Sequence, residues 1–279
     1  MKLKNFIALT VIILFYIGIS ACSKDSTTVD NSQQDANVLR FMTYNIHIAN
    51  PPSQPSTVVD VDTIAKVIKK VNPHFVTLQE VDRFTDRSGK NLDQAAKLSE
   101  LTGMHYKFFK AINRSNGEYG LAILSKYPIL EFNQVELPFV AGTGAELRTM
   151  GWVRVQLDNG QDIIVATTHI DHLEDANREL QTREILKAFK SYHNYPIVLG
   201  GDFNMNQSNS IWDLYKIVFN VPCATCPNTH SASKPTTSID YLLLNNKAAE
   251  IFSIKSYQTY LETYASDHLP VVMDLVFQK

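Results

Sequence analysis

Strand-like segments outnumber helix-like ones from residue 38 to the end of the chain, and several are joined by short turns. The clearest turn is Asp158-Asn159-Gly160, whose Asn-Gly pair signals a β-hairpin between segments 148–157 and 162–169. Many hairpin-linked strands fit two packed sheets with helices on the outer faces better than a doubly wound parallel sheet. The sequence therefore predicts an α+β fold, a four-layer α/β/β/α sandwich of two mixed, mostly antiparallel sheets.

Helical periodicity appears in a few separated segments. Apolar residues between Ile64 and Val71 follow the spacing i, i+3, i+4, i+7, and Pro73 follows them as a helix end. Further helices are predicted over 91–102, with Gly103 as the C-terminal cap, over 175–191 and over 209–218. No second linker interrupts the pattern, so we expect one domain over residues 38–279.

The N-terminal 37 residues differ from this domain. Basic Lys2 and Lys4 precede a short apolar stretch that ends in Ile19-Ser20-Ala21-Cys22. This ending resembles a bacterial lipobox, and an ordinary secretory signal is the alternative. We therefore expect a lipoprotein signal peptide over 1–21 and a polar, flexible tether over 22–37. The expected protein is an exported bacterial lipoprotein of the cell envelope, a monomer held at the membrane by a lipid on Cys22.

Loss of that signal peptide leaves 24 basic residues (26 − 2) against 28 acidic ones. The mature chain thus has no excess positive charge of the kind that nucleic-acid binding favours. Cys223 and Cys226 are the only other cysteines. In an oxidising compartment we expect them to form a disulfide; a redox motif and a zinc site supported by His230 are the alternatives.

Polar residues recur where the predicted strands end. The apolar run 195–200 leads into Gly201-Asp202-Phe203-Asn204, and alternation along an extended strand predicts that Asp202 and Asn204 share one face. Other polar residues lie in the same way at the ends of predicted strands. In chain order they are Asn45, Glu80, Tyr119, Arg148, His169, Asp240 and the pair Asp267-His268.

This ordered series resembles the endonuclease/exonuclease/phosphatase superfamily, also called DNase I-like, over nearly the whole mature chain. The resemblance implies hydrolysis of a phosphate ester with help from a hard cation, Mg²⁺, for which Mn²⁺ is a possible substitute. Glu80 is the expected principal metal ligand, with Asn45 beside it. The resemblance adds Asp267 as a further ligand or neighbour of the metal.

The remaining residues receive catalytic roles. Asp202 is predicted to position or deprotonate the attacking water, although an ordinary aspartate with a pKa near ~3.9 is a weak base. Asn204 is predicted to hydrogen-bond a phosphoryl oxygen. The resemblance implies that Asp240 pairs with His268 to favour its imidazolium, and that His169 contacts the phosphate. Tyr119 and Arg148 match family positions near the phosphate.

Three residues near these positions are less defined. Asp171 is expected to orient His169 if the strand continues, and His172 to lie at the substrate rim; a transition-metal site on this segment is the alternative. His47 is a candidate for the pocket rim.

The predicted function is metal-dependent hydrolysis of phosphate esters outside the cytoplasm, with a phosphodiesterase or nuclease first. A phosphomonoesterase or a phospholipid-headgroup hydrolase is the alternative within the same fold. Nucleic acid, a phospholipid headgroup or a soluble phosphoester would be the substrate. A non-catalytic surface-binding protein that retains the fold is the alternative of another class.

Overall fold

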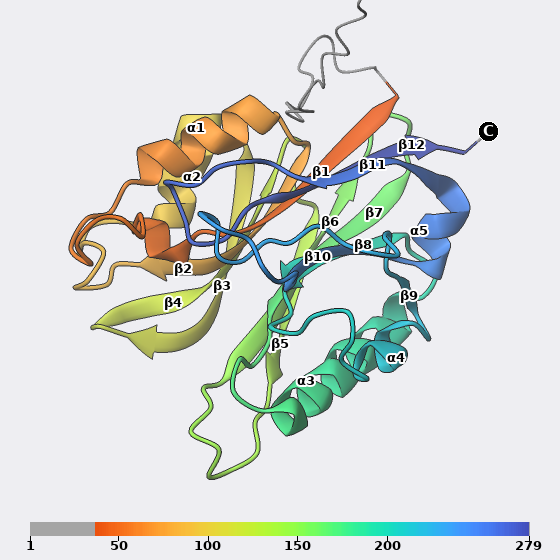
Figure 1. Cartoon of the computed structure of the whole chain (residues 1–279). Helices are drawn as coiled ribbons and strands as arrows, with labels where there is room; N and C mark the ends of the chain where they lie inside the picture. Colours follow the sequence, from red (N-terminus) through yellow and green to blue (C-terminus); the bar gives the residue numbers. More distant parts are fainter. Residues whose placement is uncertain (1–36, 279) are drawn as a thin grey trace, which may run out of the picture.

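The computed structural model describes residues 37–278, which form two six-stranded sheets (Figure 1). The first sheet has the order β11-β12-β1-β2-β4-β3, and the second has the order β5-β6-β7-β8-β10-β9. Only β1 with β2 and β7 with β8 pair in parallel; the other neighbours are antiparallel. The strands are β1 (Val38–Asn45), β2 (Phe75–Arg83), β3 (His105–Arg114), β4 (Gly117–Ser125), β5 (Glu131–Leu137), β6 (Arg148–Gln156), β7 (Asp162–His169), β8 (Ile197–Asp202), β9 (Phe219–Asn220), β10 (Asp240–Asn245), β11 (Phe252–Thr259) and β12 (Val271–Phe277).

Helices cover the outer face of each sheet, so the predicted four-layer sandwich is confirmed (Figure 1). An inner core that includes Phe41, Phe75 and Val165 lies between the sheets. The helices α1 (Val61–Val71) and α2 (Gln94–Thr102) pack on the first sheet. The helices α3 (Asp175–Ala188) and α4 (Trp212–Tyr215) pack on the second, and the remaining short ones are η1 (His47–Ala49), η2 (Phe189–Tyr192) and α5 (Asn246–Ile251).

Local sequence sets the ends of these helices. In α1 the Asp60 carboxylate accepts from the Thr63 N–H, and Asn72 closes the helix in the left-handed conformation. Asp93 caps α2 in the same way, so this helix begins later than predicted. The predicted helix over 209–218 shrinks to α4; at its N-terminal side the Asn209 side chain accepts from the Ile211 N–H and competes with helix formation there.

Two glycines in β8 permit close packing below the site: Gly200 against the facing sheet, and Gly201 against the neighbouring strand β7. A Cβ added at Gly200 would lie 2.2 Å from the Thr77 hydroxyl of the facing sheet, and one added at Gly201 would lie 2.4 Å from the Thr168 carbonyl. Above them, the Gln79 amide donates across the inter-sheet space to the Thr167 hydroxyl at 3.0 Å. The glycine pair is therefore needed for close packing directly beneath Asp202.

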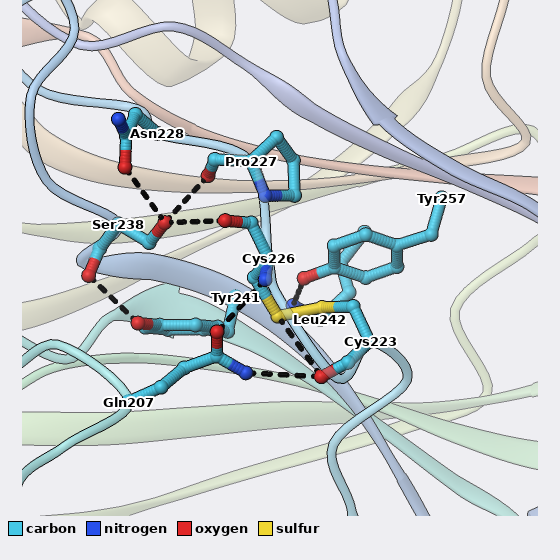
Figure 2. The surroundings of a disulfide bond; sticks show 9 residues. All are labelled: Gln207, Cys223, Cys226, Pro227, Asn228, Ser238, Tyr241, Leu242 and Tyr257. Atoms are coloured by element: carbon cyan, nitrogen blue, oxygen red, sulfur yellow. Dashed lines mark hydrogen bonds between the residues drawn. A yellow bond between two sulfur atoms is a disulfide. The ribbon is translucent and has the colours of Figure 1, made fainter.

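The expected disulfide between Cys223 and Cys226 is present, with their Cα atoms 5.1 Å apart (Figure 2). The Gln207 side chain holds this turn from both sides, since it donates to the Cys223 carbonyl and accepts from the Cys226 N–H. The zinc alternative for this pair is thereby wrong, because the two sulfurs are bonded to each other, whereas the disulfide does not test the redox alternative. The predicted signal peptide, the lipid site at Cys22 and the tether up to residue 36 lie outside the described residues. None of the described helices is long and apolar enough to cross a membrane.

Candidate active site

One end of the sandwich collects the polar residues that the sequence singles out. Strands β1, β2, β7 and β8 finish at this end, so each delivers its last side chains there. Strands β6, β10 and β12 run the opposite way, so their first residues or preceding loop arrive at the same place. The site therefore follows from strand direction, with Asn45, Glu80, His169 and Asp202 from strand ends and Arg148, Asp240, Asp267 and His268 from strand starts.

Asp202 lies at the centre of this cluster and is buried. Its Oδ2 accepts from the Asn45 amide at 3.0 Å and lies 3.5 Å from His169 Nε2 and 3.8 Å from His268 Nε2. Its Oδ1 accepts from the Asn204 N–H at 2.9 Å. The carboxylate is thus surrounded by donors from four different segments of the chain.

Burial, together with the negative charge of Asp240, raises the pKa of Asp202 to about 7. The charge of His268 and the donors on Asn204 and Asn45 oppose this rise only in part. A carboxylate that titrates near neutrality is a far better general base than an ordinary aspartate. Asp202 thus differs from an ordinary aspartate because the two packed layers remove it from water, and its role toward the attacking water stays a prediction.

His268 and Asp240 form the pair that the family resemblance implies. His268 Nδ1 lies 2.8 Å from Asp240 Oδ2, and both side chains are buried. Burial alone would lower the pKa of His268, but the charge of Asp240 and its hydrogen bond outweigh burial and raise the pKa to about 10. At neutral pH this imidazolium directs a charged Nε2–H toward Asp202 and the space beside it.

His169 differs from His268 because its cationic neighbour is an arginine. Burial, and next the charge of Arg148, hold the pKa of His169 well below its usual range, so the ring is neutral. An Arg148 N–H faces His169 Nδ1 at 3.4 Å, and another faces His172 Nδ1 at 3.2 Å. Since arginine only donates, Nδ1 of the neutral His169 accepts and its Nε2 carries the proton. His169 therefore presents a donor to Asp202, not an ion pair.

Arg148 itself is buried, and no described carboxylate forms an ion pair with it. Its Nε has no hydrogen-bond partner. A buried, uncompensated guanidinium is costly, which indicates that an anionic group completes this part of the site.

Glu80 reaches the site because its backbone departs from the strand. A β-bulge interrupts the β2–β4 pairing between Leu78 and Val81, and Glu80 takes the left-handed conformation with φ of 57°. Its Oε1 accepts from the Asn45 amide at 3.2 Å. Asn45 Oδ1 in turn accepts from the His47 N–H. In this orientation Asn45 links the Glu80 and Asp202 carboxylates through its nitrogen, and its role as an oxygen ligand stays a prediction.

Asp267 lies on the other side of this link. The neighbouring Ser266 hydroxyl donates to the Asn45 carbonyl at 2.7 Å, which holds the loop against the end of β1. Glu80 and Asp267 are both partly exposed, and neither pairs with a lysine or arginine within the described residues. Accessible carboxylates without a basic partner fit a hard dication such as Mg²⁺. These two residues, with Asn45 beside them, would hold it.

The remaining predicted residues have mixed outcomes. Asn204 does not follow the strand alternation, because β8 ends at Asp202 and Asn204 has φ of 48°. Its amide donates one hydrogen to the Ile170 carbonyl and keeps one free for a ligand.

Tyr119 lies partly buried, with the Arg87 guanidinium 5.3 Å from its ring centroid. Burial, and next the charge of Glu80, raise the pKa of Tyr119, so the phenol is a neutral donor near the metal side.

The prediction that Asp171 orients His169 is wrong. The strand ends at His169, and Asp171 Oδ1 accepts from the backbone N–H groups of Leu173 and Glu174, where it shapes the entry to α3. Neither described cluster with metal-binding geometry contains it or His172. His172 is exposed beside Arg148, as expected for a rim residue.

Sequence reasoning missed His230, to which it gave only the unlikely zinc role. Its ring centroid lies 4.8 Å from that of His268, and its Nε2 lies 3.9 Å from Asp267 Oδ2. No sequence signal marks this contact, because 37 residues separate the two segments and the loop that carries His230 has no periodic pattern.

A two-sheet sandwich with carboxylates, an amide and histidines gathered at its strand ends defines a class of phosphoester hydrolases. A family model described as the endonuclease/exonuclease/phosphatase family matches residues 37–268, and the chain belongs to that family. Its members and structural neighbours are hydrolases that act on phosphate esters. No curated protein sequence matches the chain.

Solved structures share the fold at low sequence identity. An endonuclease/exonuclease/phosphatase from Beutenbergia cavernae is 24% identical with a TM-score of 0.73, and the match covers 86% of this chain and 72% of that one. A mannosyl-6-phosphatase from Bacteroides thetaiotaomicron is 21% identical with a TM-score of 0.68, over 86% of this chain and 100% of that one. The human Nocturnin catalytic domain with bound sulfate is 20% identical with a TM-score of 0.66, over 87% and 94%.

Proposed function

We propose that this protein is a Mg²⁺-dependent phosphohydrolase in which water attacks a phosphate ester. The observation that carries the proposal is the buried Asp202, whose pKa of about 7 suits a general base and which contacts donors from His169 and Asn45. Mg²⁺, held by Glu80 and Asp267 with Asn45 beside them, would neutralise charge on the phosphoryl and leaving-group oxygens.

The protein's own residues divide the remaining work. Asp202 orients the water and accepts its proton. The His268 imidazolium, fixed by Asp240, directs Nε2–H at the developing phosphoryl charge, as the free Asn204 amide hydrogen does. His169 holds the Asp202 carboxylate through Nε2–H, while Arg148 fixes its tautomer.

The charge of the site and of the whole chain bears on the class of substrate. The sequence prediction placed phosphodiesters first. The buried Arg148 without a carboxylate partner favours a more highly charged group, and a phosphomonoester dianion supplies it. The mildly acidic mature chain argues against nucleic acid as the first choice. The phosphodiester thus stays the first candidate from the sequence, and the phosphomonoester is added as a second candidate because of Arg148. A lipid-anchored enzyme at the cell envelope would meet such substrates outside the cytoplasm.

The test uses bis-p-nitrophenyl phosphate and p-nitrophenyl phosphate side by side, with Mg²⁺, with Mn²⁺ and with EDTA. We expect turnover that EDTA abolishes and that Asp202→Asn lowers by at least about a thousandfold, or about 4 kcal/mol of transition-state stabilisation. Asp213→Asn, a change at an exposed carboxylate on α4, is the matched control. Absence of turnover of both compounds with either metal would favour the surface-binding alternative.

A further inference from the structure

The loop between β9 and β10 carries a histidine to the mouth of the active site, and the proposed hydrolysis does not use it. His230 packs its ring against that of His268, with centroids 4.8 Å apart. Its side chain is 42% exposed, and its Nε2 faces Asp267 Oδ2 at 3.9 Å. Solvent therefore reaches this imidazole, although it touches two residues of the site.

His230, Asp267 and His268 together offer three ligand atoms within 4.8 Å of one another. Two imidazole nitrogens and one carboxylate oxygen form a ligand set for Zn²⁺ and similar transition metals, whereas Mg²⁺ prefers oxygen ligands alone. We propose that these three residues form a binding site for a transition-metal dication of the zinc class. This site shares Asp267 with the Mg²⁺ site and differs from it because it includes His230 and excludes Glu80.

One ligand is already oriented for this role. Asp240 accepts from His268 at Nδ1, which leaves Nε2 as the atom that faces Asp267 at 4.0 Å. A carboxylate behind a histidine is the usual support of a metal-binding imidazole. Ligands bound tetrahedrally at about 2.0–2.1 Å lie about 3.4 Å apart, so separations of up to 4.8 Å require closure by up to about 1.4 Å. The half-exposed His230 ring can supply it by rotation.

The backbone holds the ligands in register. The His230 N–H donates to the Thr237 carbonyl at 3.1 Å, and the Ala232 N–H donates to the Asp267 carbonyl. The Leu269 N–H donates to the Thr229 carbonyl at 2.8 Å. These bonds join the His230 loop directly to the segment that carries Asp267 and His268. At the start of the loop, the disulfide and the Ser238 hydroxyl fix the turn around Cys226 (Figure 2).

A metal on His268 Nε2 occupies the position of the proton that the hydrolysis needs. The bound ion therefore inhibits the enzyme, and this consequence alone rests on the proposed function. Binding of the ion does not rest on the proposed function. A failure of metal binding can therefore be distinguished from a failure of the proposed hydrolysis.

The test is a titration of the full-length, chelator-treated protein with Co²⁺ in excess Mg²⁺, without substrate, followed by visible d–d absorption. We expect one Co²⁺ per chain with the intense bands of a four- or five-coordinate site that contains nitrogen ligands, and displacement by Zn²⁺. His230→Ala should weaken Co²⁺ binding by about 10- to 100-fold. His193→Ala, which removes an exposed imidazole whose Nδ1 lies 2.9 Å from the Lys190 carbonyl, should leave it unchanged.

His230→Gln serves as a second variant that retains a polar side chain, and thermal melts confirm that each variant folds. Zn²⁺ should inhibit Mg²⁺-dependent turnover of the parent at concentrations at least about tenfold lower than those required for either His230 variant. Equal Co²⁺ affinity in the parent and both His230 variants would overturn the proposal. So would the absence of these bands in the parent.

Discussion

Replacement of Asp240 by asparagine should move the whole pH–rate profile of this enzyme toward acid. Catalysis requires Asp202 without its proton and His268 with its proton. The pKa of Asp202 is about 7 and that of His268 about 10, so the parent should be most active between these values. Asp240 raises both, because its charge disfavours a second carboxylate and favours the imidazolium.

The size of the expected pH shift follows from the pair of His268 and Asp240. Raising a histidine pKa from 6.5 to about 10 corresponds to about 5 kcal/mol in favour of the charged ring. Asp240 supplies the largest favourable part through its charge and the 2.8 Å hydrogen bond, while Asp202 and Asp267 supply the rest. We therefore expect Asp240→Asn to lower the basic limb by about two pH units and to lower the acidic limb by a smaller amount.

The assay measures kcat/KM for p-nitrophenyl phosphate across pH at one fixed Mg²⁺ concentration, so that any effect of the cation is common to both proteins. At pH 9 the variant should retain about a tenth or less of its own maximal rate, whereas the parent remains on its plateau. Asp213→Asn controls for the loss of one negative charge elsewhere on the protein. A basic limb at the same pH in Asp240→Asn and parent would refute the assignment of His268 as the protonated group.

Three further changes test other parts of the site and its frame. Glu80→Gln should raise the Mg²⁺ concentration for half-maximal activity at least about tenfold, measured by metal titration, because it removes the charged ligand. Arg148→Met should weaken inhibition by inorganic phosphate about tenfold or more while the free energy of unfolding stays equal or rises, since a buried uncompensated charge is removed; a large loss of stability would contradict this account. Joint Cys223→Ala and Cys226→Ala should cost about 2 kcal/mol of unfolding free energy in urea melts, as expected for a very short disulfide loop.

The fold was predictable because its signals are local. The spacing of apolar residues over 64–71 and the Asp60 cap define α1, and the Asn159-Gly160 turn defines the β6–β7 hairpin. The order of polar residues along the chain also predicted which side chains meet, because strands that end at one edge place their last residues together. Helix lengths were less predictable: the Asn209 side chain accepts from the Ile211 N–H, so α4 begins only at Trp212.

The chemical state of the site was not predictable in this way. The pKa of Asp202 depends on burial by layers that are distant in sequence and on Asp240, which pairs with it across β8 and β10. Likewise, the contact of His230 with His268 depends on a loop path that only tertiary hydrogen bonds define. A sequence pattern specifies which residues arrive at a site, whereas their charge depends on what surrounds them.

Backbone conformation is a further feature of the site that the sequence did not predict. His47, Glu80 and Asn204 all have positive φ, of 46°, 57° and 48°, although none is glycine. Such conformations cost of order 1 kcal/mol or more each and persist only where the surroundings impose them. Here the surroundings are part of the site: the His47 N–H donates to Asn45 Oδ1, and the Asn204 N–H donates to Asp202 Oδ1. The turn at His47 thus orients the Asn45 side chain, whose nitrogen donates to Asp202, and the turn at Asn204 directs a backbone N–H at the same carboxylate. The sandwich beneath these turns supplies the stability that they cost.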